Sequence, residues 1–460
     1  MAESGTTSGP ELLVELDRAS HTPLHKQLSD GLRAAIRAGR LASGNPMPST
    51  RVLASDLGVS RRLVVDVYSQ LTAEGFLHSA QGSGTRVALV DSSDSSSRAV
   101  QSPPSRFDID FSPGTPDLGS FPRHAWLRAL RHGLDRAESS VLGYRHGHGL
   151  PAMRAVLAGY LSRTRGVVAD PERIVVCSGV TQGLALLARC LDGPLAMEDP
   201  GFWAHRMMLQ YNGIRPIPVP VDADGLDVAS LRDSGARAIL TTPAHQSPTG
   251  VVLPAARRTA LCGWARDGRL IIEDDYDAEY RYDRAPIGAL QGIASDRVVY
   301  LGSVSKTLAP GLRLGWMVLP DHLVDPVRTA KSVADNGSSV TDQFAFTELI
   351  ESGAYDRHLR QMRRRYLSRR NALLDALAQH LPWVTVLGAA AGIQLSVQFP
   401  DGYPIHELAR RAAEMRVRVE PLTRWYANPT AAPAGLILGY ANLTESRIRE
   451  GIRILGRASD

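Results

Sequence analysis

Over the first ninety residues, apolar side chains recur at helical spacing in three successive segments. Leucines and an isoleucine at four-residue intervals from Leu24 to Ile36 predict a helix with one apolar face. Ser49 is suited to cap a second helix that ends at Gly58, and Ser60 is suited to cap a third. We expect helices over 22–39, 49–58 and 60–75, then short strands over 76–79 and 85–90 around a Gly-rich turn. Three helices and a hairpin in this order predict a winged helix-turn-helix.

From residue 107 onward, short β-rich runs alternate with helical segments. The clearest strands are 173–179, 236–242, 269–275, 297–303 and 313–319. Their nearly continuous apolar character is typical of strands buried on both faces, as in a parallel sheet. A helical region over 341–381 then leads into strand-like runs at 393–399, 417–421 and 435–441. We therefore expect an α/β fold with a mostly parallel sheet and a small C-terminal α+β subdomain.

Residues 91–106 separate these two patterns. They are rich in serine and proline and carry hardly any apolar side chains. Such a stretch cannot bury enough surface to offset the entropy cost of ordering, which is typical of a flexible linker. We expect a domain over 1–90 and a second over 107–460.

Composition excludes several classes of protein. Of 460 residues, 43 % are hydrophobic and 22 % charged, close to the averages for soluble proteins. No apolar run approaches the roughly 18 residues of a membrane-spanning helix, and the N-terminus has no signal-peptide pattern. The three cysteines, Cys177, Cys190 and Cys262, do not form a disulfide framework or a metal-ligand spacing. We expect a cytoplasmic protein without a structural metal.

The net charge of +5 suggests an acidic partner such as nucleic acid, but its distribution does not identify one. Residues 1–90 hold nine basic and eight acidic side chains, so most of the excess lies in the larger domain. Only three of the 52 basic residues are lysines: Lys26, Lys306 and Lys331. Chemistry that needs a neutralisable amine therefore has three candidates, and the surroundings of Lys26 and Lys331 favour a solvated role for both.

The start of the third predicted helix carries the polar residues that helix-turn-helix recognition requires. Arg61 and Arg62 lie outside its apolar stripe and could reach a guanine edge or a phosphate, while Arg51 would touch the DNA backbone. The Gly-rich turn that precedes Arg86 is small enough to enter a minor groove. The alternative is an ordinary three-helix module with solvated arginines. The predicted DNA contacts are Arg51, Ser60, Arg61, Arg62, Gly82, Ser83 and Gly84.

Motifs within 23–88 favour DNA binding. GRL, PSTR, LGVSR, AEG and GSGT occur in this order, and the segment closely resembles the DNA-binding domain of the GntR family. The resemblance implies a double-stranded DNA operator as partner.

Lys306 stands out among the three lysines. It follows a predicted buried strand, so its side chain is expected in the crevice at the carboxyl ends of the strands. Hydroxyls at Ser303 and Ser305 flank it, and Arg313 follows. An amine beside phosphate-binding groups is what a Schiff base with a phosphorylated aldehyde requires.

Three further pieces of sequence point to the same crevice. Asp274 ends a predicted strand, where a carboxylate could keep a pyridine nitrogen protonated, and Tyr276 is close enough to donate to a phenolate oxygen. Gly179, Val180 and Thr181 form a turn before a helix, which is an anion site. Phe202 or Trp203 could stack on a planar ring. For the acidic strand end alone, pairing with Arg281 or Arg284 is the simpler interpretation.

Taken in chain order, these motifs resemble the fold-type I pyridoxal 5′-phosphate (PLP) enzymes of the aspartate aminotransferase superfamily. Joined to a GntR-type domain, they resemble the MocR subfamily of bacterial transcription regulators. FSPGTPDLGSFP, GYRHGHGLPAMRAVLAGYLSRTRGV and TPAHQSPTG extend the resemblance over about 15–90 and 107–450. It implies that Lys306 carries the internal aldimine, Asp274 binds the pyridine nitrogen and Tyr276 the ring oxygen. By the same resemblance the phosphate, stacking and cross-dimer residues are Gly179, Val180, Thr181, Ser303, Ser305, Arg313, Phe202 and Tyr144.

Two positions depart from the superfamily pattern. Ile437 stands where transaminases place an arginine for the substrate α-carboxylate, and isoleucine cannot make that contact. Ser247 replaces the asparagine of Asn-Pro-Thr-Gly, so one ring-oxygen contact is in doubt unless Gln246 or His245 compensates. Both changes argue against an efficient aminotransferase.

We therefore expect a homodimeric, PLP-dependent transcription regulator whose aminotransferase-like domain senses PLP, an amine or an amino acid. The genes it controls would serve vitamin B6 or amine metabolism. A working aminotransferase that also binds DNA is the main alternative, and a DNA-binding protein with a cofactor-free domain is the third.

Overall fold

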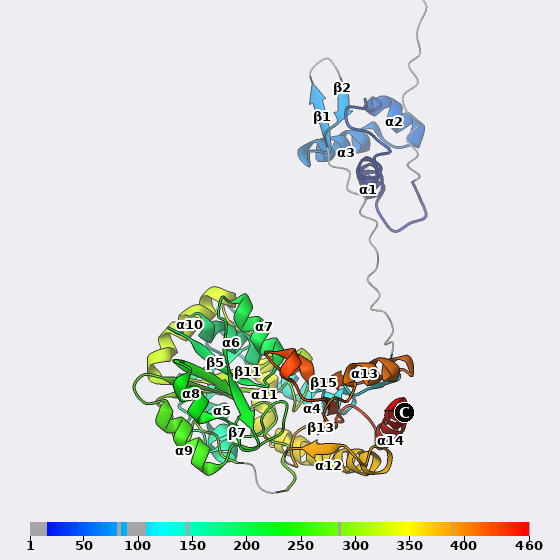
Figure 1. Cartoon of the computed structure of the whole chain (residues 1–460). Coiled ribbons are helices and arrows are strands. Elements are labelled where there is room, and N and C mark those ends of the chain that lie inside the picture. The colour runs from blue at the N-terminus through cyan, green and yellow to red at the C-terminus, as the bar shows by residue number, and fades with distance from the viewer. Residues whose placement is uncertain are drawn as a thin grey trace, which may run out of the picture. The chain divides into compact units, whose positions relative to one another are not determined.

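A computed structural model describes residues 16–80, 84–89, 107–143, 147–283, 287–388 and 390–459. The chain forms two compact units, residues 1–103 and 104–460 (Figure 1). Gly82, Ser83, Tyr144 and the predicted linker lie outside the described residues, so the roles predicted for them stay predictions.

Unit 1 is the predicted winged helix-turn-helix. Its elements are α1 (Leu24–Arg37), α2 (Thr50–Leu57), α3 (Arg61–Ala73), β1 (Leu77–Ala80) and β2 (Gly84–Val87). Ser49 and Ser60 cap α2 and α3 as predicted, each hydroxyl accepting a backbone N–H. Gly58 ends α2 with a φ of 62°, which favours glycine. The strands pair antiparallel, and the apolar faces of all three helices meet in one core.

An eight-stranded sheet forms the centre of unit 2. In spatial order its strands are β4 (Ile174–Cys177), β11 (Gly315–Val318), β10 (Val298–Ser303), β9 (Leu270–Asp274), β8 (Ala238–Thr241), β5 (Leu195–Asp199), β6 (Ile217–Asp222) and β7 (Gly225–Leu226). The run from β10 to β6 is parallel, which confirms the predicted mostly parallel sheet. The strand expected over 313–319 differs, because β11 is antiparallel to both neighbours. The short segment 304–314 returns the chain beside β10 without the longer crossover that a parallel pair needs.

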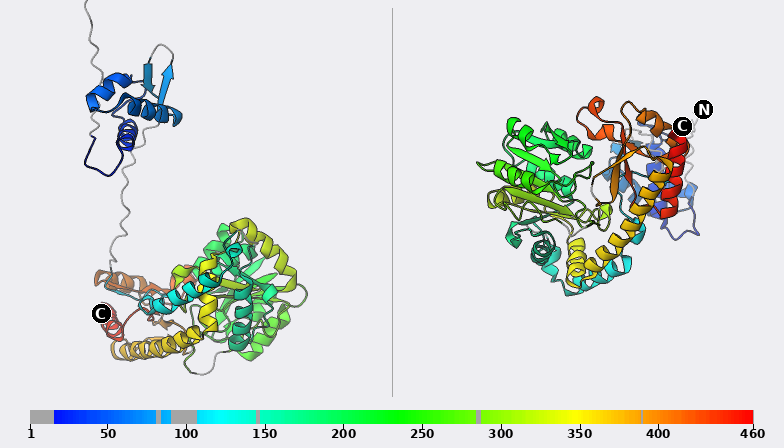
Figure 2. Two further views of the ribbon diagram at one scale, coloured as in Figure 1. Left: turned by 180° about the vertical axis from the view of Figure 1, so that it is seen from behind. Right: turned by 60° about the horizontal axis from the view of Figure 1, so that its bottom comes forward.

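Helices cover both faces of this sheet because successive strand residues point to opposite sides (Figure 2). Val175 and Cys177 pack with one set of helices, whereas Ile174 and Val176 pack with the other. The first set is α6 (Val180–Ala188), α7 (Trp203–Tyr211) and α10 (Asp321–Asp335). The second is α4 (Arg123–Arg136), α5 (Pro151–Arg165), α8 (Val228–Asp233), α9 (Ala255–Trp264) and α11 (Val340–Glu351).

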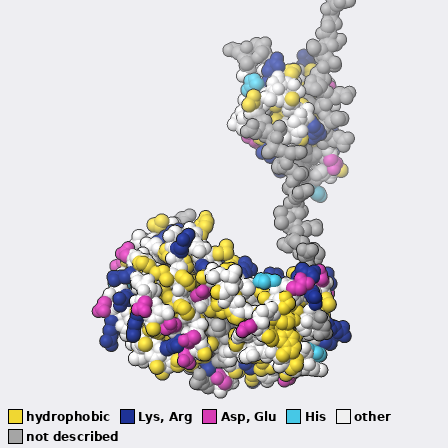
Figure 3. All heavy atoms as spheres, viewed as in Figure 1, with side chains coloured by type: hydrophobic (Ala, Val, Ile, Leu, Met, Phe, Trp, Pro, Cys, Tyr) yellow, Lys and Arg dark blue, Asp and Glu magenta, His cyan; other side chains and the backbone are white. Residues whose placement is uncertain are grey.

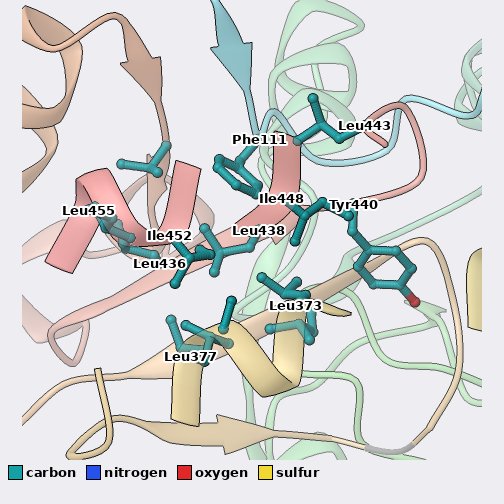
Figure 4. Close-up of a cluster of buried hydrophobic side chains, with 14 of the residues drawn as sticks. Phe111, Leu373, Leu377, Leu436, Leu438, Tyr440, Leu443, Ile448, Ile452 and Leu455 are labelled. Carbon is teal, nitrogen blue, oxygen red and sulfur yellow. The ribbon is translucent and has the colours of Figure 1, made fainter. Parts of the chain in front are cut away.

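The C-terminal subdomain is the predicted α+β element. Its sheet is β12 (Thr385–Leu387), β13 (Gln394–Gln398), β16 (Gly435–Gly439) and β15 (Glu420–Pro421), with α12 (Ala354–His380), α13 (Ile405–Glu414) and α14 (Glu445–Ser459) packed against it. Figure 4 shows side chains of α12, β16 and α14 meeting in this core. Gly353, at φ 67°, splits the helical region expected over 341–381 into α11 and α12.

Short elements complete the fold. β14 (Val417–Arg418) pairs in parallel with β3 (Ile109–Asp110), which ties the start of unit 2 to its C-terminal subdomain. The 3-10 helices are η1 (Leu118–Ser120), η2 (Ser139–Leu142), η3 (Pro171–Arg173), η4 (Pro310–Leu312), η5 (Leu422–Trp425) and η6 (Pro429–Ala431). Basic and acidic side chains are interspersed on the face of unit 2 seen in Figure 3. None of the helices that the structure describes is long and apolar enough to span a bilayer.

Candidate functional site

A cavity of about 210 Å³ lies at the carboxyl ends of the parallel strands of unit 2. The fold brings nine of the predicted cofactor residues to its wall: Val180, Thr181, Phe202, Asp274, Tyr276, Ser303, Ser305, Lys306 and Arg313. The strands position them, because β9 ends at Asp274 and β10 ends at Ser303. Several other wall residues come from distant segments: Pro113, Gly114, His205, Thr242, Pro310, Gln394 and Trp425.

Lys306 places its amine inside this cavity. Its Nζ donates a hydrogen bond to the carbonyl oxygen of Gly114 at 2.6 Å. Burial lowers the pKa of Lys306, while the nearby Asp277 and Asp274 act in the opposite direction. A lowered pKa increases the fraction of neutral amine, which is the nucleophilic form.

Asp274 has a carboxyl oxygen at the cavity that is not hydrogen-bonded within the described residues. Its Oδ1 is buried and has no hydrogen-bond partner within the described part of the chain. Burial raises the pKa of Asp274 to about 7, and the negative charge of Asp275 adds to the effect. His205 Nδ1 lies 3.8 Å from Oδ2, and burial lowers the pKa of this histidine to about 4. A buried acceptor at a cavity wall fits a ligand that brings its own N–H, as a protonated pyridine does.

The other end of the cavity is built for an anion. Gly179 has a φ of 88° and turns the chain so that α6 begins at the cavity with Val180 and Thr181. Arg313 donates to the carbonyl oxygen of Ser178 at 2.5 Å, and a Cβ on Gly179 would lie 3.2 Å from its guanidinium. With Ser303 at the end of β10 and Ser305 just beyond it, these groups form a donor set that suits a phosphate.

Tyr276 and Ser247 line a third side of the cavity. The Tyr276 hydroxyl lies 3.1 Å from Nδ1 of His245, whose Nδ1 also lies 3.0 Å from Oδ1 of Asp277. Gln246 points elsewhere, since its Nε2 donates to the carbonyl oxygen of Pro200 at 2.8 Å. Of the two residues that could compensate for Ser247, His245 is therefore the one beside Tyr276.

The aromatic wall distinguishes the two stacking candidates. Phe202 lines the cavity, whereas the ring of Trp203 is covered by the guanidinium of Arg424 at 3.4 Å. Ile437, which replaces the arginine of transaminases, is fully buried and packs with Leu422 and Trp425. This part of the site is apolar.

One sequence interpretation is wrong for the residue that the structure describes, and a second is wrong outright. The acidic strand end does not pair with Arg281, which binds Asp283; instead, Asp275 pairs with Arg165 at 2.7 Å, and both side chains are 2 % exposed. Arg284 lies outside the described residues. Lys331 is not solvated: its side chain is fully buried. The amine of Lys331 donates to Gln182, Asp335 and Ser338 because loop 335–339 and the start of α6 close over it.

In unit 1, the described DNA candidates are on the surface. Arg51, Ser60, Arg61, Arg62 and Gly84 are all exposed. Arg61 makes a 3.4 Å hydrogen bond to Thr50 from its Nε. The side chain of Arg86 differs, since it donates to the carbonyl oxygen of Gly44 at 2.9 Å and so braces the wing.

Both units match known families. Residues 24–87 match the bacterial regulatory proteins of the gntR family, and residues 108–455 match aminotransferase class I and II. A probable rhizopine catabolism regulatory protein, MocR, from Rhizobium meliloti is 35 % identical, with 97 % of this chain and 96 % of that protein covered. The pyridoxine biosynthesis transcriptional regulator PdxR of Corynebacterium glutamicum is 32 % identical over 95 % of this chain and 96 % of its own length.

Solved structures agree for unit 2. Kynurenine aminotransferase from Pyrococcus horikoshii, crystallised in complex with PMP, is 26 % identical with a TM-score of 0.71, covering 76 % of this chain and 90 % of its own. The α-aminoadipate aminotransferase LysN of Thermus thermophilus is 27 % identical with a TM-score of 0.69, covering 77 % and 92 %. This chain therefore belongs to the MocR-type transcription regulators, which join a gntR-family DNA-binding domain to a class I and II aminotransferase domain.

Proposed function

We propose that the protein binds PLP at the unit 2 cavity and that this binding controls its affinity for an operator. Lys306 would hold the cofactor covalently, Asp274 would bind its pyridine nitrogen and Tyr276 its ring oxygen. Phosphate and stacking contacts would come from Gly179, Val180, Thr181, Ser303, Ser305, Arg313 and Phe202, with Tyr144 of a second copy completing the site. The observation that carries the proposal is the orphaned Oδ1 of Asp274 in the same cavity as the amine of Lys306.

When bound, PLP supplies an aldehyde that captures an amine. The chain's own residues prepare for this. Burial lowers the pKa of Lys306 and so favours its reactive neutral form. A protonated pyridine nitrogen would pair with Asp274 and restore its ionised form. Arg313 and the start of α6 would neutralise the phosphate.

The surroundings of Ile437 favour PLP itself as the effector. An amino acid needs a charged partner for its carboxylate, and this position offers a fully buried apolar side chain packed with Trp425. An amine or an amino acid held by other groups is the alternative effector. Similarity to a regulator of pyridoxine biosynthesis supports vitamin B6 metabolism as the controlled process, with amine metabolism as the alternative.

We also propose a homodimer. Leu127 and Leu134 stand seven residues apart on α4 and are 61 % and 38 % exposed, and Leu142 nearby is 59 % exposed. Burial of such a face against a second copy would remove apolar surface from water. It would also pair two winged units for two half-sites of an operator. PLP would act by binding one arrangement of the dimer more tightly than another.

One titration tests the function. Purified protein would be titrated with PLP, and separately with candidate amines and amino acids, while visible absorbance and binding to its own upstream DNA are followed together. We expect PLP uptake that changes operator affinity, and Lys306→Ala should lose both the absorbance band and the response. If PLP is taken up without any change in operator affinity, the sensor function is wrong.

Catalytic transamination is the second candidate, because Lys306, Asp274 and Tyr276 line one cavity. It predicts that a panel of amino donors converts bound PLP to its amine form. If none does so, the aminotransferase alternative is rejected while the sensor function stands.

A further inference from the structure

Two buried polar residues beside the cavity have no role in the proposed function. His245 and Asp277 are 5 % and 1 % exposed, and neither lines the cavity. They lie directly behind Tyr276, on the side where Ser247 stands in place of the asparagine expected for a ring-oxygen contact. Burial of an imidazole and a carboxylate costs free energy unless they are paired. What this pair contributes to the site follows from its hydrogen bonds.

The geometry assigns the proton on His245. Its Nδ1 lies 3.0 and 3.1 Å from the two carboxylate oxygens of Asp277. A carboxylate only accepts, so Nδ1 must carry the hydrogen and donate it. Nδ1 then has no lone pair for the Tyr276 hydroxyl 3.1 Å away, and the tyrosine oxygen can only share the same N–H as an acceptor.

This arrangement directs the hydrogen of Tyr276 away from His245 and toward the cavity, where the hydroxyl of Ser247 also lies within its reach. The pKa of Tyr276 lies well above its ordinary value because the hydroxyl is desolvated, and the charge of Asp277 raises it further. The phenol therefore keeps its hydrogen at neutral pH. The Tyr276 hydroxyl is therefore oriented to donate a hydrogen bond to an acceptor in the cavity, such as a phenolate oxygen.

The C-terminal subdomain holds the pair in place. A Cβ on Gly392 would overlap both the His245 ring and the Asp277 carboxylate, so only glycine fits there. The hydroxyls of Tyr282 and Tyr440 each donate to the carbonyl oxygen of Gly392 at 2.6 Å. The backbone that encloses the pair is thus fixed by two tyrosines, of which Tyr440 is buried and Tyr282 half-buried.

We propose that His245 and Asp277 are positioning residues that aim the Tyr276 hydroxyl at the ring oxygen of the cofactor and so replace the missing asparagine contact. Asp277 holds His245 with its hydrogen on Nδ1, and His245 keeps the tyrosine as a donor. This inference rests on the proposed function, because it needs PLP in the cavity.

A double-mutant cycle on the full-length protein tests it. PLP affinity would be measured by titrating cofactor-free protein, with the position of the bound cofactor's absorbance band as a second readout. Tyr276→Phe and His245→Leu should each weaken PLP binding about tenfold, the effect of one hydrogen bond to a charged group. In the Tyr276→Phe background, His245→Leu should change affinity by less than about twofold, because no hydroxyl remains to be aimed.

Conservative variants separate positioning from packing. Asn at 245 places an amide N–H near the position of Nδ1, so His245→Asn should stay within about threefold of wild type and keep its absorbance band. His245→Gln places its amide near Nε2 instead and should resemble His245→Leu. If His245→Leu does not fold, the PLP affinities of His245→Asn and His245→Gln still test the positioning role. Asp277→Asn should weaken binding, because a neutral amide favours the hydrogen on Nδ1 less than a carboxylate does, and the Nδ1 lone pair of the other tautomer can accept the tyrosine hydrogen.

The outcomes are distinguishable. Equal losses from His245→Leu in both backgrounds, or equal affinities for His245→Asn and His245→Gln, would overturn the positioning role and leave the sensor function intact. Wild-type protein that takes up no PLP would overturn both.

Discussion

Two lysines show how burial changes the energetic role of one side chain. Lys331 Nζ lies 2.6 Å from Asp335 with its side chain fully buried, whereas Lys26 Nζ lies 2.9 Å from Asp30 with its side chain 60 % exposed. Both are i,i+4 pairs in helices. We expect Lys331→Met to lower the free energy of unfolding of unit 2 by about 1–3 kcal/mol, because Asp335 loses its positively charged partner and Gln182 and Ser338 each lose one hydrogen bond.

Lys26→Met is the matched control. Its partner stays solvated, so the decrease should be below about 0.5 kcal/mol. Urea denaturation of each variant measures both changes. Equal, small effects in the two variants would show that the buried amine contributes nothing beyond a surface pair.

Asp274 should make the stability of cofactor-free protein depend on pH. Its pKa is raised to about 7, so the folded state holds a proton that the unfolded chain releases near pH 4. The free energy of unfolding therefore falls as pH rises between these values, and the penalty is complete above pH 7. We expect cofactor-free Asp274→Asn to be more stable than wild type by about 2–4 kcal/mol at pH 8 and nearly equal at pH 4. Thermal unfolding across this range checks it, and a constant difference at every pH would contradict it.

Residues that follow strands in sequence could be predicted for the site, and residues that reach it through tertiary packing could not. Asp274 and Lys306 each come just after an apolar run, and that position alone puts them at the crevice. Gln394 and Trp425 belong to the C-terminal subdomain, whose docking no local pattern reveals. His205 had a usable signal, since it lies one turn after Phe202 at the start of α7.

At the scale of elements, one glycine decides where a helix stops. Gly353 separates α11 from α12 at a φ of 67°, a conformation that disfavours any side chain. Gly353→Ala should lower the free energy of unfolding by about 1 kcal/mol. Gly159 lies inside α5, and a Cβ added there would meet no other atom within 4 Å, so Gly159→Ala should raise the free energy of unfolding by about 0.5–1 kcal/mol. Denaturant titration measures the sign of the change in the free energy of unfolding for both variants. Stabilisation by Gly353→Ala would contradict the expected backbone strain at residue 353.

Strand character follows from apolar runs only where both faces are buried. β9 and β10 are buried at every position, and their sequences predict them. β6 alternates between exposed positions and positions that are partly or fully buried, and it contains two prolines, which an interior strand would not tolerate. It pairs on its outer side only with the two-residue β7, so its prolines leave few hydrogen bonds unmade.

For the whole molecule, net charge is a poor guide to the DNA-binding surface. The sequence of α12 alone holds seven arginines against two aspartates, a net charge as large as that of the entire chain. Two of these arginines form ion pairs within unit 2. Arg369 pairs with Asp117 and donates to the carbonyl oxygen of Ala441, and Arg365 also pairs with Asp117. Arg365 and Arg369, which belong to the basic excess, therefore stabilise unit 2.

DNA binding and PLP binding should be separable, because the residues predicted for them lie in different units. Arg61 and Arg62 lie exposed at the start of α3, in a unit whose core shares no residue with the cofactor cavity. The double variant Arg61→Ala, Arg62→Ala should weaken operator binding at least 100-fold and lower the salt dependence by about one power of concentration for each phosphate that is no longer bound. PLP uptake and its absorbance should not change.

Arg37→Ala with Arg40→Ala removes the same charge from exposed positions near the end of α1 and should affect operator binding far less. Fluorescence anisotropy over a range of salt measures both, and loss of PLP uptake together with DNA binding would show that the two units do not function independently.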